Sequence, residues 1–168
     1  ALFHDRLKHA LQRSMRMSIG NAQQWEIGIF MIDLDKFKTV NDTYGHNYGD
    51  MLLREIAQRM RAHVRKTDTV ARMGGDEFML IFENISGTED FPILAKKILD
   101  CFTQPFHLDG KTIAIKASIG ISLFPQDGLD LETLFKMADK AMYKAKEVGN
   151  SYCCYAQIKG NSKLNGKD

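Results

Sequence analysis

The chain has 168 residues, of which 44% are hydrophobic, so its length and composition fit one domain with a substantial core. Its 23 Lys and Arg against 21 Asp and Glu leave a formal net charge of +2, which excludes a broadly basic surface of the kind that binds nucleic acid. The same composition excludes a disordered chain and a small scaffold that depends on disulfides.

The cysteines and the chain start give further expectations. Cys101, Cys153 and Cys154 have no metal-binding spacing, and we interpret them as reduced thiols of a cytoplasmic domain. The longest apolar run, over residues 27–32, is too short to cross a bilayer, so no membrane contact by this domain is expected. The absence of an initiator methionine predicts a segment cut from a longer protein, whose other regions could carry a membrane anchor.

The first half of the chain predicts a mixture of helices and strands. Residues 1–17 carry apolar side chains at helical spacing. Residues from Trp25 to Ile32 are apolar on both alternating faces, which is typical of a strand covered on both sides. The elements expected next are a short helix over 36–43, a longer helix over 48–64, and a hairpin of strands 69–73 and 78–82.

The second half continues in the same way. The expected elements are a helix over 91–102, a hairpin of strands 106–108 and 111–124, a helix over 131–148, and a strand over 152–157. The longer arm of this hairpin is expected to bend near Ser118 or Gly120. Asp130 is the expected N-cap of the last helix, and Gly149 is its expected stop.

The order of these elements predicts the fold class. Residues 1–157 should form one α+β domain, in which helices flank a central, mostly antiparallel sheet. Residues 158–168 have almost nothing to bury and are expected to form a disordered polar tail.

Two carboxylates follow the predicted central strand. Asp33 and Asp35 stand two residues apart, so on an extended chain both side chains lie on the same face. Mg²⁺ is usually held by one or two carboxylates together with oxygens of a phosphate-bearing substrate. The two residues therefore suggest a cation site, while the alternative that they end the strand and cap the next helix stays open.

The turn of the first hairpin carries a second pair of acids. Gly74 and Gly75 allow the backbone to approach a ligand closely, because neither residue has a Cβ atom. Asp76 and Glu77 follow at once, and a plain hairpin turn gains nothing from two neighbouring carboxylates that repel each other. The strand end and the turn together predict one cation-dependent site.

Several motifs then match a known family. Residues 72–78 carry the RxGGDEF signature. The companion pattern DxDxFK, ND, GH and GD is present in this order at residues 33–38, 41–42, 45–46 and 49–50. Over about residues 1–157, the chain resembles the GGDEF domain of bacterial diguanylate cyclases.

This resemblance implies a palm-like βααββαβ core, similar to nucleotidyl cyclases, and condensation of two GTP molecules into cyclic di-GMP with loss of two pyrophosphates. It also implies two Mg²⁺ ions per active site, with Mn²⁺ able to replace them. The implied metal ligands are Asp33, the backbone carbonyl of Leu34, Asp76 and Glu77. The implied catalytic residues are Asp76, Glu77 and Lys38, with Lys38 offsetting charge in the transition state.

The resemblance also implies contacts with the substrate. Asn41 and Asp50 would recognise guanine, because a carboxylate accepts hydrogen bonds from the N1–H and the exocyclic amine of this base. His46 would contact the substrate, and Lys146 would contact a phosphate. Taken alone, Asp50 could be a helix N-cap, His46 a packed loop residue, and Lys146 a solvated helix residue, so these alternatives stay open.

A product-binding site and one departure complete the comparison with the family pattern. Arg65 and Asp68 match the RxxD inhibitory site, which would bind cyclic di-GMP, although a surface ion pair is the alternative. Residues 145–151 depart from the family's AKxxGRN pattern, because Asn150 stands where a phosphate-binding arginine is expected. The lost charge and bidentate fork predict weaker GTP binding or slower turnover.

The resemblance implies a homodimer in which each copy binds one GTP, formed transiently or driven by other domains of the parent protein. No nucleic-acid partner is expected. Residues 120–128 resemble GGDEF domains that precede an EAL phosphodiesterase domain in the same chain. The alternative function is a catalytically weak GGDEF module that senses GTP or cyclic di-GMP and regulates a linked domain.

Overall fold

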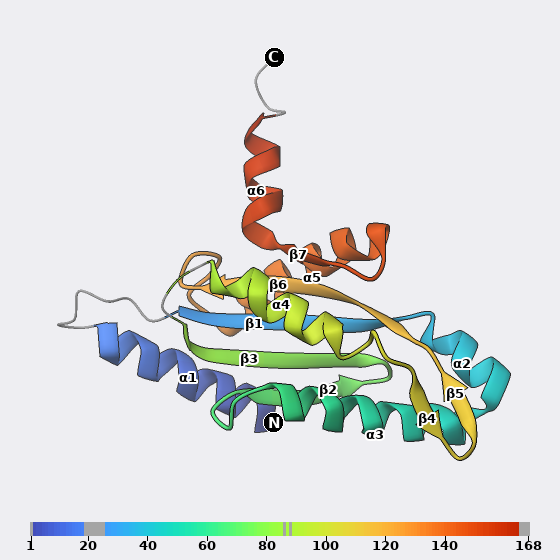
Figure 1. Ribbon diagram of the computed structural model, residues 1–168. Helices are drawn as coiled ribbons and strands as arrows, with labels where there is room; N and C mark the ends of the chain where they lie inside the picture. Colours follow the sequence, from blue (N-terminus) through green and yellow to red (C-terminus); the bar gives the residue numbers. More distant parts are fainter. Residues whose placement is uncertain (1, 19–25, 86, 88, 165–168) are drawn as a thin grey trace.

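The computed structural model describes residues 2–18, 26–85, 87 and 89–164, so Trp25 lies outside the described residues. Its centre is a five-stranded sheet with the strand order β2-β3-β1-β6-β7 (Figure 1). These strands are β1 (Glu26–Asp35), β2 (Thr69–Gly74), β3 (Glu77–Ile85), β6 (Lys116–Phe124) and β7 (Tyr152–Cys154). Neighbouring strands are antiparallel except β6 and β7, which confirms the predicted mostly antiparallel sheet.

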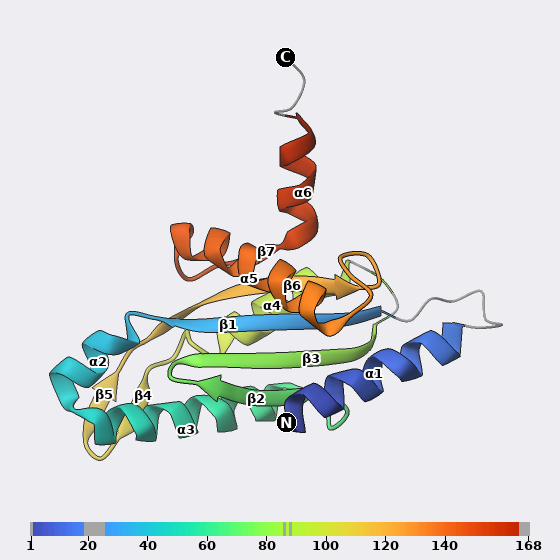
Figure 2. The same cartoon turned by 180° about the vertical axis from the view of Figure 1, so that it is seen from behind.

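Helices cover both faces of this sheet. They are α1 (Leu2–Ser18), α2 (Phe37–Tyr44), α3 (His46–His63), α4 (Asp90–Asp100), α5 (Leu131–Val148) and α6 (Tyr155–Leu164). Figures 1 and 2 show α3 and α4 on one face and α1 and α5 on the other, while α6 projects away from the sheet. The predicted α+β class is confirmed. All three cysteines are free, and no helix within the described ranges is long and apolar enough to cross a membrane.

Strand β1 is buried on both faces, as its sequence predicts. Phe30 and Ile32 pack in a core with residues of α3 and α4. Ile29 packs on the opposite face, in a second core with residues of α1 and α5. Because side chains alternate along a strand, Asp33 and Asp35 continue the row of Ile29 and face the α5 side of the sheet.

Helix α5 has both of its predicted ends. Asp130 is the N-cap, and its carboxylate accepts a hydrogen bond from the Thr133 backbone N–H at 2.8 Å. Gly149 ends the helix with φ 73°, a left-handed conformation that glycine adopts without strain. These two ends fix the position of Lys146, which lies in the last turn of α5.

The second predicted hairpin differs from the structure in its longer arm. β4 (Phe106–Leu108) pairs with β5 (Lys111–Ile113) in a separate two-stranded sheet, and the chain leaves that sheet before β6. The predicted bend near Ser118 or Gly120 is wrong, because β6 pairs with β1 without interruption through both residues. Gly120 instead allows close packing, since a Cβ atom there would lie 2.1 Å from the Ala138 carbonyl oxygen in α5.

The last predicted strand also differs. It ends at Cys154, so the strand predicted over 155–157 is wrong; α6 begins there and makes residues 158–164, expected in the tail, helical. The Cys154 backbone N–H donates to Gln157 Oε1 at 3.2 Å, which is the backward hydrogen bond of a capping box and favours a helix start. Residues 165–168 of the expected tail lie outside the described residues.

Candidate active site at the end of the central strand

An ion pair between β1 and α5 forms the centre of the candidate site. Asp33 Oδ2 lies 2.8 Å from Lys146 Nζ. Burial raises the pKa of Asp33; the Lys146 ammonium opposes the rise, and Asp76 adds to it. Burial alone would lower the pKa of Lys146, but Asp33, followed by Asp76 and Glu77, raises it. Three acids therefore act electrostatically on this single ammonium, and the cluster favours a further cation.

Asp35 has a structural role beside this pair. One of its carboxylate oxygens accepts from Ser118 Oγ at 2.8 Å, and the other accepts from the Asn150 backbone N–H at 2.9 Å. Asp35 thus ties β1 to β6 and to the segment after α5. The N-cap of α2 is Lys36, which makes no side-chain capping bond, so the alternative in which Asp33 and Asp35 cap this helix is wrong.

The turn between β2 and β3 lies against the end of β1. The Leu34 backbone N–H donates to the Asp76 carbonyl at 3.4 Å. Because the N–H and C=O of a strand residue point to the same side, the Leu34 carbonyl faces this turn as well. Arg72 Nε donates to the Gly75 carbonyl at 2.9 Å and closes the turn. A Cβ atom at Gly74 would meet nothing within 4 Å, so the fold itself leaves open space at this glycine.

The acids fit a shared metal ion better than a self-contained metal site. No three His, Cys, Asp or Glu side chains in the described part of the chain form a group that could hold a metal. Glu77 is the cross-strand partner of Asp33. Burial raises the pKa of Asp33, and the negative charge of Asp76 raises it further. Mg²⁺ needs only one or two carboxylates when substrate phosphates complete its coordination. One or two carboxylates from among Asp33, Asp76 and Glu77 would fit this kind of binding.

A second group of predicted residues lies where α2 contacts α3. Asn41 of α2 packs against Gly49 of α3, where a Cβ atom would lie 1.9 Å from Asn41 Oδ1. This Oδ1 atom is buried without a hydrogen-bond partner in the described residues. Asp50 follows Gly49 and is exposed. Because α3 begins at His46, Asp50 lies inside the helix, so its interpretation as an N-cap is wrong.

Not all of the predicted residues meet in one pocket. A pocket of about 920 Å³ brings Asp33 and Lys146 together. Its remaining lining residues are Asp35, Lys36, Thr39, Val40, Thr43, Tyr44, Ile113, Ala114, Ile115, Lys116, Val148, Gly149 and Asn150. Lys38, Asn41 and His46 do not line it, and Lys38 and His46 are exposed. The α2 residues in the pocket therefore occupy a different face of that helix from Lys38 and Asn41.

Lys36 and Lys116 are pocket residues that the sequence reasoning missed. Lys36 directly follows the acid pair in the sequence, and this position was a usable signal. Its left-handed backbone, with φ 62°, could not be predicted from the sequence. Lys116 gave no local signal, because it reaches the site only through the pairing of β6 with β1, where it stands opposite Asp35.

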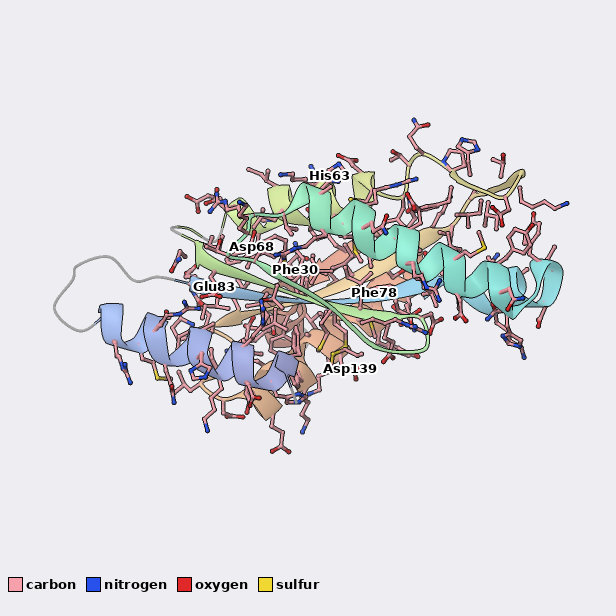
Figure 3. The ribbon with its side chains drawn as sticks, turned by 90° about the horizontal axis from the view of Figure 1, so that it is seen from below. Phe30, His63, Asp68, Phe78, Glu83 and Asp139 are labelled. Carbon is pink, nitrogen blue, oxygen red and sulfur yellow. The ribbon has the colours of Figure 1, made fainter. Side chains whose placement is uncertain are left out.

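The predicted inhibitory residues meet at the other end of β2. The Arg65 backbone N–H donates to Asp68 Oδ2 at 2.8 Å, while the Arg65 side chain is exposed. Asp68 is only 2% exposed, and its Oδ1 atom has no hydrogen-bond partner in the described residues. Figure 3 shows Asp68 near Glu83, with α3 on one side and α1 on the other. The side-chain ion pair considered as the alternative does not form, because Asp68 binds the backbone of Arg65.

These features agree with a match to a family model. The model described as "Diguanylate cyclase, GGDEF domain" matches residues 1–151. The chain therefore belongs to the GGDEF domain family.

Relatives carry this domain in proteins of different named activities. MucR of Pseudomonas aeruginosa, a bifunctional diguanylate cyclase/cyclic di-GMP phosphodiesterase, is 44% identical over 155 residues, covering 92% of this chain and 22% of MucR. NbdA of the same species, a cyclic di-GMP phosphodiesterase, is 37% identical over 125 residues, covering 74% of this chain and 16% of NbdA. The chain thus spans less than a quarter of either relative.

The fold also matches a solved structure. A truncated TpbB from Pseudomonas aeruginosa, comprising only the GGDEF domain, superposes with a TM-score of 0.84 at 34% sequence identity. The match covers 92% of this chain and 87% of that chain. The palm-like core expected from the motifs is therefore present here.

Proposed function

We propose that this domain is a Mg²⁺-dependent diguanylate cyclase, which condenses two GTP molecules into cyclic di-GMP and releases two pyrophosphates. The observation that carries this proposal is the ion pair of Asp33 and Lys146 at the end of β1, on which Asp76 acts electrostatically from a turn with open space at Gly74. Two-domain synthesis needs such an open edge, because each reacting group must reach a second nucleotide.

We place the triphosphate and the guanine of the nucleotide on different sides of α2. The triphosphate would lie at the first turn of α2, because the N-terminus of a helix favours anions, with Lys146 and Lys38 contacting phosphates. Asp33, the Leu34 carbonyl, Asp76 and Glu77 would hold Mg²⁺. When bound, the metal supplies positive charge for activation of the 3′-hydroxyl and for the leaving pyrophosphate. Asp76 and Glu77 are proposed as the catalytic acids of the turn.

The α2 and α3 contact would select guanine. The exposed Asp50 carboxylate accepts from N1–H and the exocyclic amine, which adenine does not offer in this arrangement. The unpartnered Asn41 Oδ1 is a further acceptor beside it. His46, at the start of α3, would contact the substrate from the same end of the helix. These groups support GTP over ATP as the substrate.

Each chain offers one set of these residues, so synthesis would need two copies facing each other with one GTP each. We expect a symmetric and transient homodimer, stabilised by other parts of the parent protein. The test is to incubate the purified chain with GTP and Mg²⁺ at a series of protein concentrations and to chromatograph the product. Cyclic di-GMP should form at a rate proportional to the square of protein concentration at the dilute end. A rate per chain that does not depend on concentration would contradict the two-copy site.

A second candidate function is a sensor that binds GTP or cyclic di-GMP without useful turnover. The observation that favours it is Asn150, which brings no positive charge to the pocket and has φ 47°. Asparagine tolerates this left-handed conformation better than arginine does, so the backbone itself suits the neutral residue. The intact acids of the β2 and β3 turn favour the cyclase.

Gly49→Ala should weaken the binding of guanosine nucleotides about tenfold, because the added Cβ atom must displace the Asn41 side chain. The displaced atom is at the end of a side chain, so the free energy of unfolding should fall by only about 1 kcal/mol. Calorimetric titration with GMP measures the affinity. Gly160→Ala, where a Cβ atom meets nothing within 4 Å, is the matched control. Equal affinity in both variants would remove Asn41 from guanine recognition.

Product inhibition would act through Arg65 and Asp68, which lie at one end of β2 while the acid turn lies at the other. The six residues of β2 span about 20 Å, so product bound here does not block the catalytic turn directly. The proposed coupling therefore runs through β2 and its pairing with β3.

Arg65→Ala should weaken cyclic di-GMP binding about tenfold and leave the fold intact, because only the exposed side chain is lost while the N–H that binds Asp68 stays. Titration calorimetry with cyclic di-GMP measures this effect. Lys66→Ala removes the neighbouring exposed positive charge and is the control. If Arg65→Ala binds the dinucleotide as tightly as the control does, the inhibitory site is not at Arg65.

A further inference from the structure

The pocket that contains Asp33 and Lys146 is lined by further lysines that take no part in their ion pair. Lys146 is bound to Asp33, and Asp35 is satisfied by Ser118 Oγ and the Asn150 N–H. Lys36 and Lys116 also line the pocket, but neither ammonium group forms a hydrogen bond or ion pair in the part of the chain that is described. Two lysines are thus available for an anionic ligand in this pocket.

The position of Lys116 is fixed by the sheet. It is the cross-strand partner of Asp35 at the first position of β6, so the two side chains share one face. The hydrogen bond from Ser118 Oγ to Asp35 confirms that alternate residues of β6 point to this face. Lys116 therefore stands on the wall of the pocket across β1 from the acid turn, while Lys146 enters from α5.

We propose that Lys116 binds the terminal phosphates of the nucleotide and supplies the positive charge that Asn150 does not bring to this pocket. The inference rests on the proposed binding of GTP at the end of β1. An ammonium on a flexible stem binds phosphate as a point charge, so it does not need the fixed geometry of a guanidinium. Lys36 lies on the α2 side of the same pocket and adds to the field, but Lys116 is the residue fixed by a strand.

The test compares Lys116→Gln with Lys111→Gln, which removes an exposed lysine of β5 that does not line the pocket. Calorimetry uses Mg²⁺ with a GTP analogue whose α and β phosphates are joined by a methylene group, and with GMP. Lys116→Gln should weaken binding of the analogue about tenfold and leave binding of GMP unchanged, whereas Lys111→Gln should change neither affinity. The inference would be overturned if Lys116→Gln weakened GMP binding as much as analogue binding, or if it left the affinity for the analogue unchanged. It would also be overturned if the unchanged chain did not bind the analogue.

A double variant shows whether the two positions serve the same ligand. Adding Asn150→Arg to Lys116→Gln should restore most of the lost affinity for the analogue, since position 150 lines the same pocket. A folded double variant with no recovery would refute the shared role. These measurements record binding and not turnover, so they test the role of Lys116 independently of the proposed reaction. A chain that binds the analogue through Lys116 but forms no cyclic di-GMP refutes only the cyclase proposal.

Discussion

Asp76→Ala should reduce cyclic di-GMP formation by about 1,000-fold, which is the largest functional effect expected for a single substitution in this domain. The side chain acts electrostatically on both Asp33 and Lys146, so its loss removes one of the acids proposed to hold the metal. The backbone carbonyl that accepts from the Leu34 N–H is retained in alanine, so the strand and the turn should stay in place. Product chromatography after incubation with GTP and Mg²⁺ measures the effect.

Asp100→Ala is the control for this substitution, because Asp100 is an exposed acid at the end of α4, outside the pocket. Its activity should equal that of the unchanged chain. Unfolding curves in urea should coincide for all three proteins. Retained turnover in a folded Asp76→Ala variant would show that the metal and catalytic assignments of this residue are wrong.

Gly120→Ala should cause the largest loss of stability, about 3 kcal/mol or more. The new Cβ atom would lie 2.1 Å from the Ala138 carbonyl oxygen and 2.2 Å from the Met142 backbone nitrogen. Both atoms belong to the backbone of α5, so no side chain can rotate away and the whole helix must move. Since α5 carries Lys146, the same displacement should also disrupt the candidate site.

Urea unfolding measures this loss, and Gly74→Ala is the matched control. A Cβ atom at Gly74 meets nothing within 4 Å, so its free energy of unfolding should stay within about 0.5 kcal/mol of the unchanged chain. If Gly120→Ala is as stable as Gly74→Ala, α5 does not lie on β6 as closely as described.

The fold could be predicted where local signals agree. The helix over 131–148 was predicted to the residue, because an apolar stripe, the Asp130 cap and Gly149 mark it independently. The division of 111–124 into two strands was not predictable, since it depends on which sheet each half joins. Gln157, three residues after Cys154, was the sequence signal for the start of α6, because its side chain accepts the capping hydrogen bond from the Cys154 N–H. The strand propensity of the neighbouring residues concealed this signal.

The candidate site divides in the same way. Asp33 and Asp76 could be predicted from motifs, since each stands at the end of a strand or in a turn that its own neighbours define. The role of Asp35 could not, because its partner Ser118 lies 83 residues further along the chain. Lys116 was missed for the same reason: its place depends on the register of β6 against β1.

The most direct test is product formation by this chain fused to a dimeric coiled coil, which removes weak association as a reason for inactivity. The fusion is incubated with GTP and Mg²⁺, and its products are separated and identified by mass. Cyclic di-GMP with two pyrophosphates for each molecule formed is the predicted result. Binding of the GTP analogue without any cyclic di-GMP would contradict the cyclase and assign the domain to nucleotide sensing.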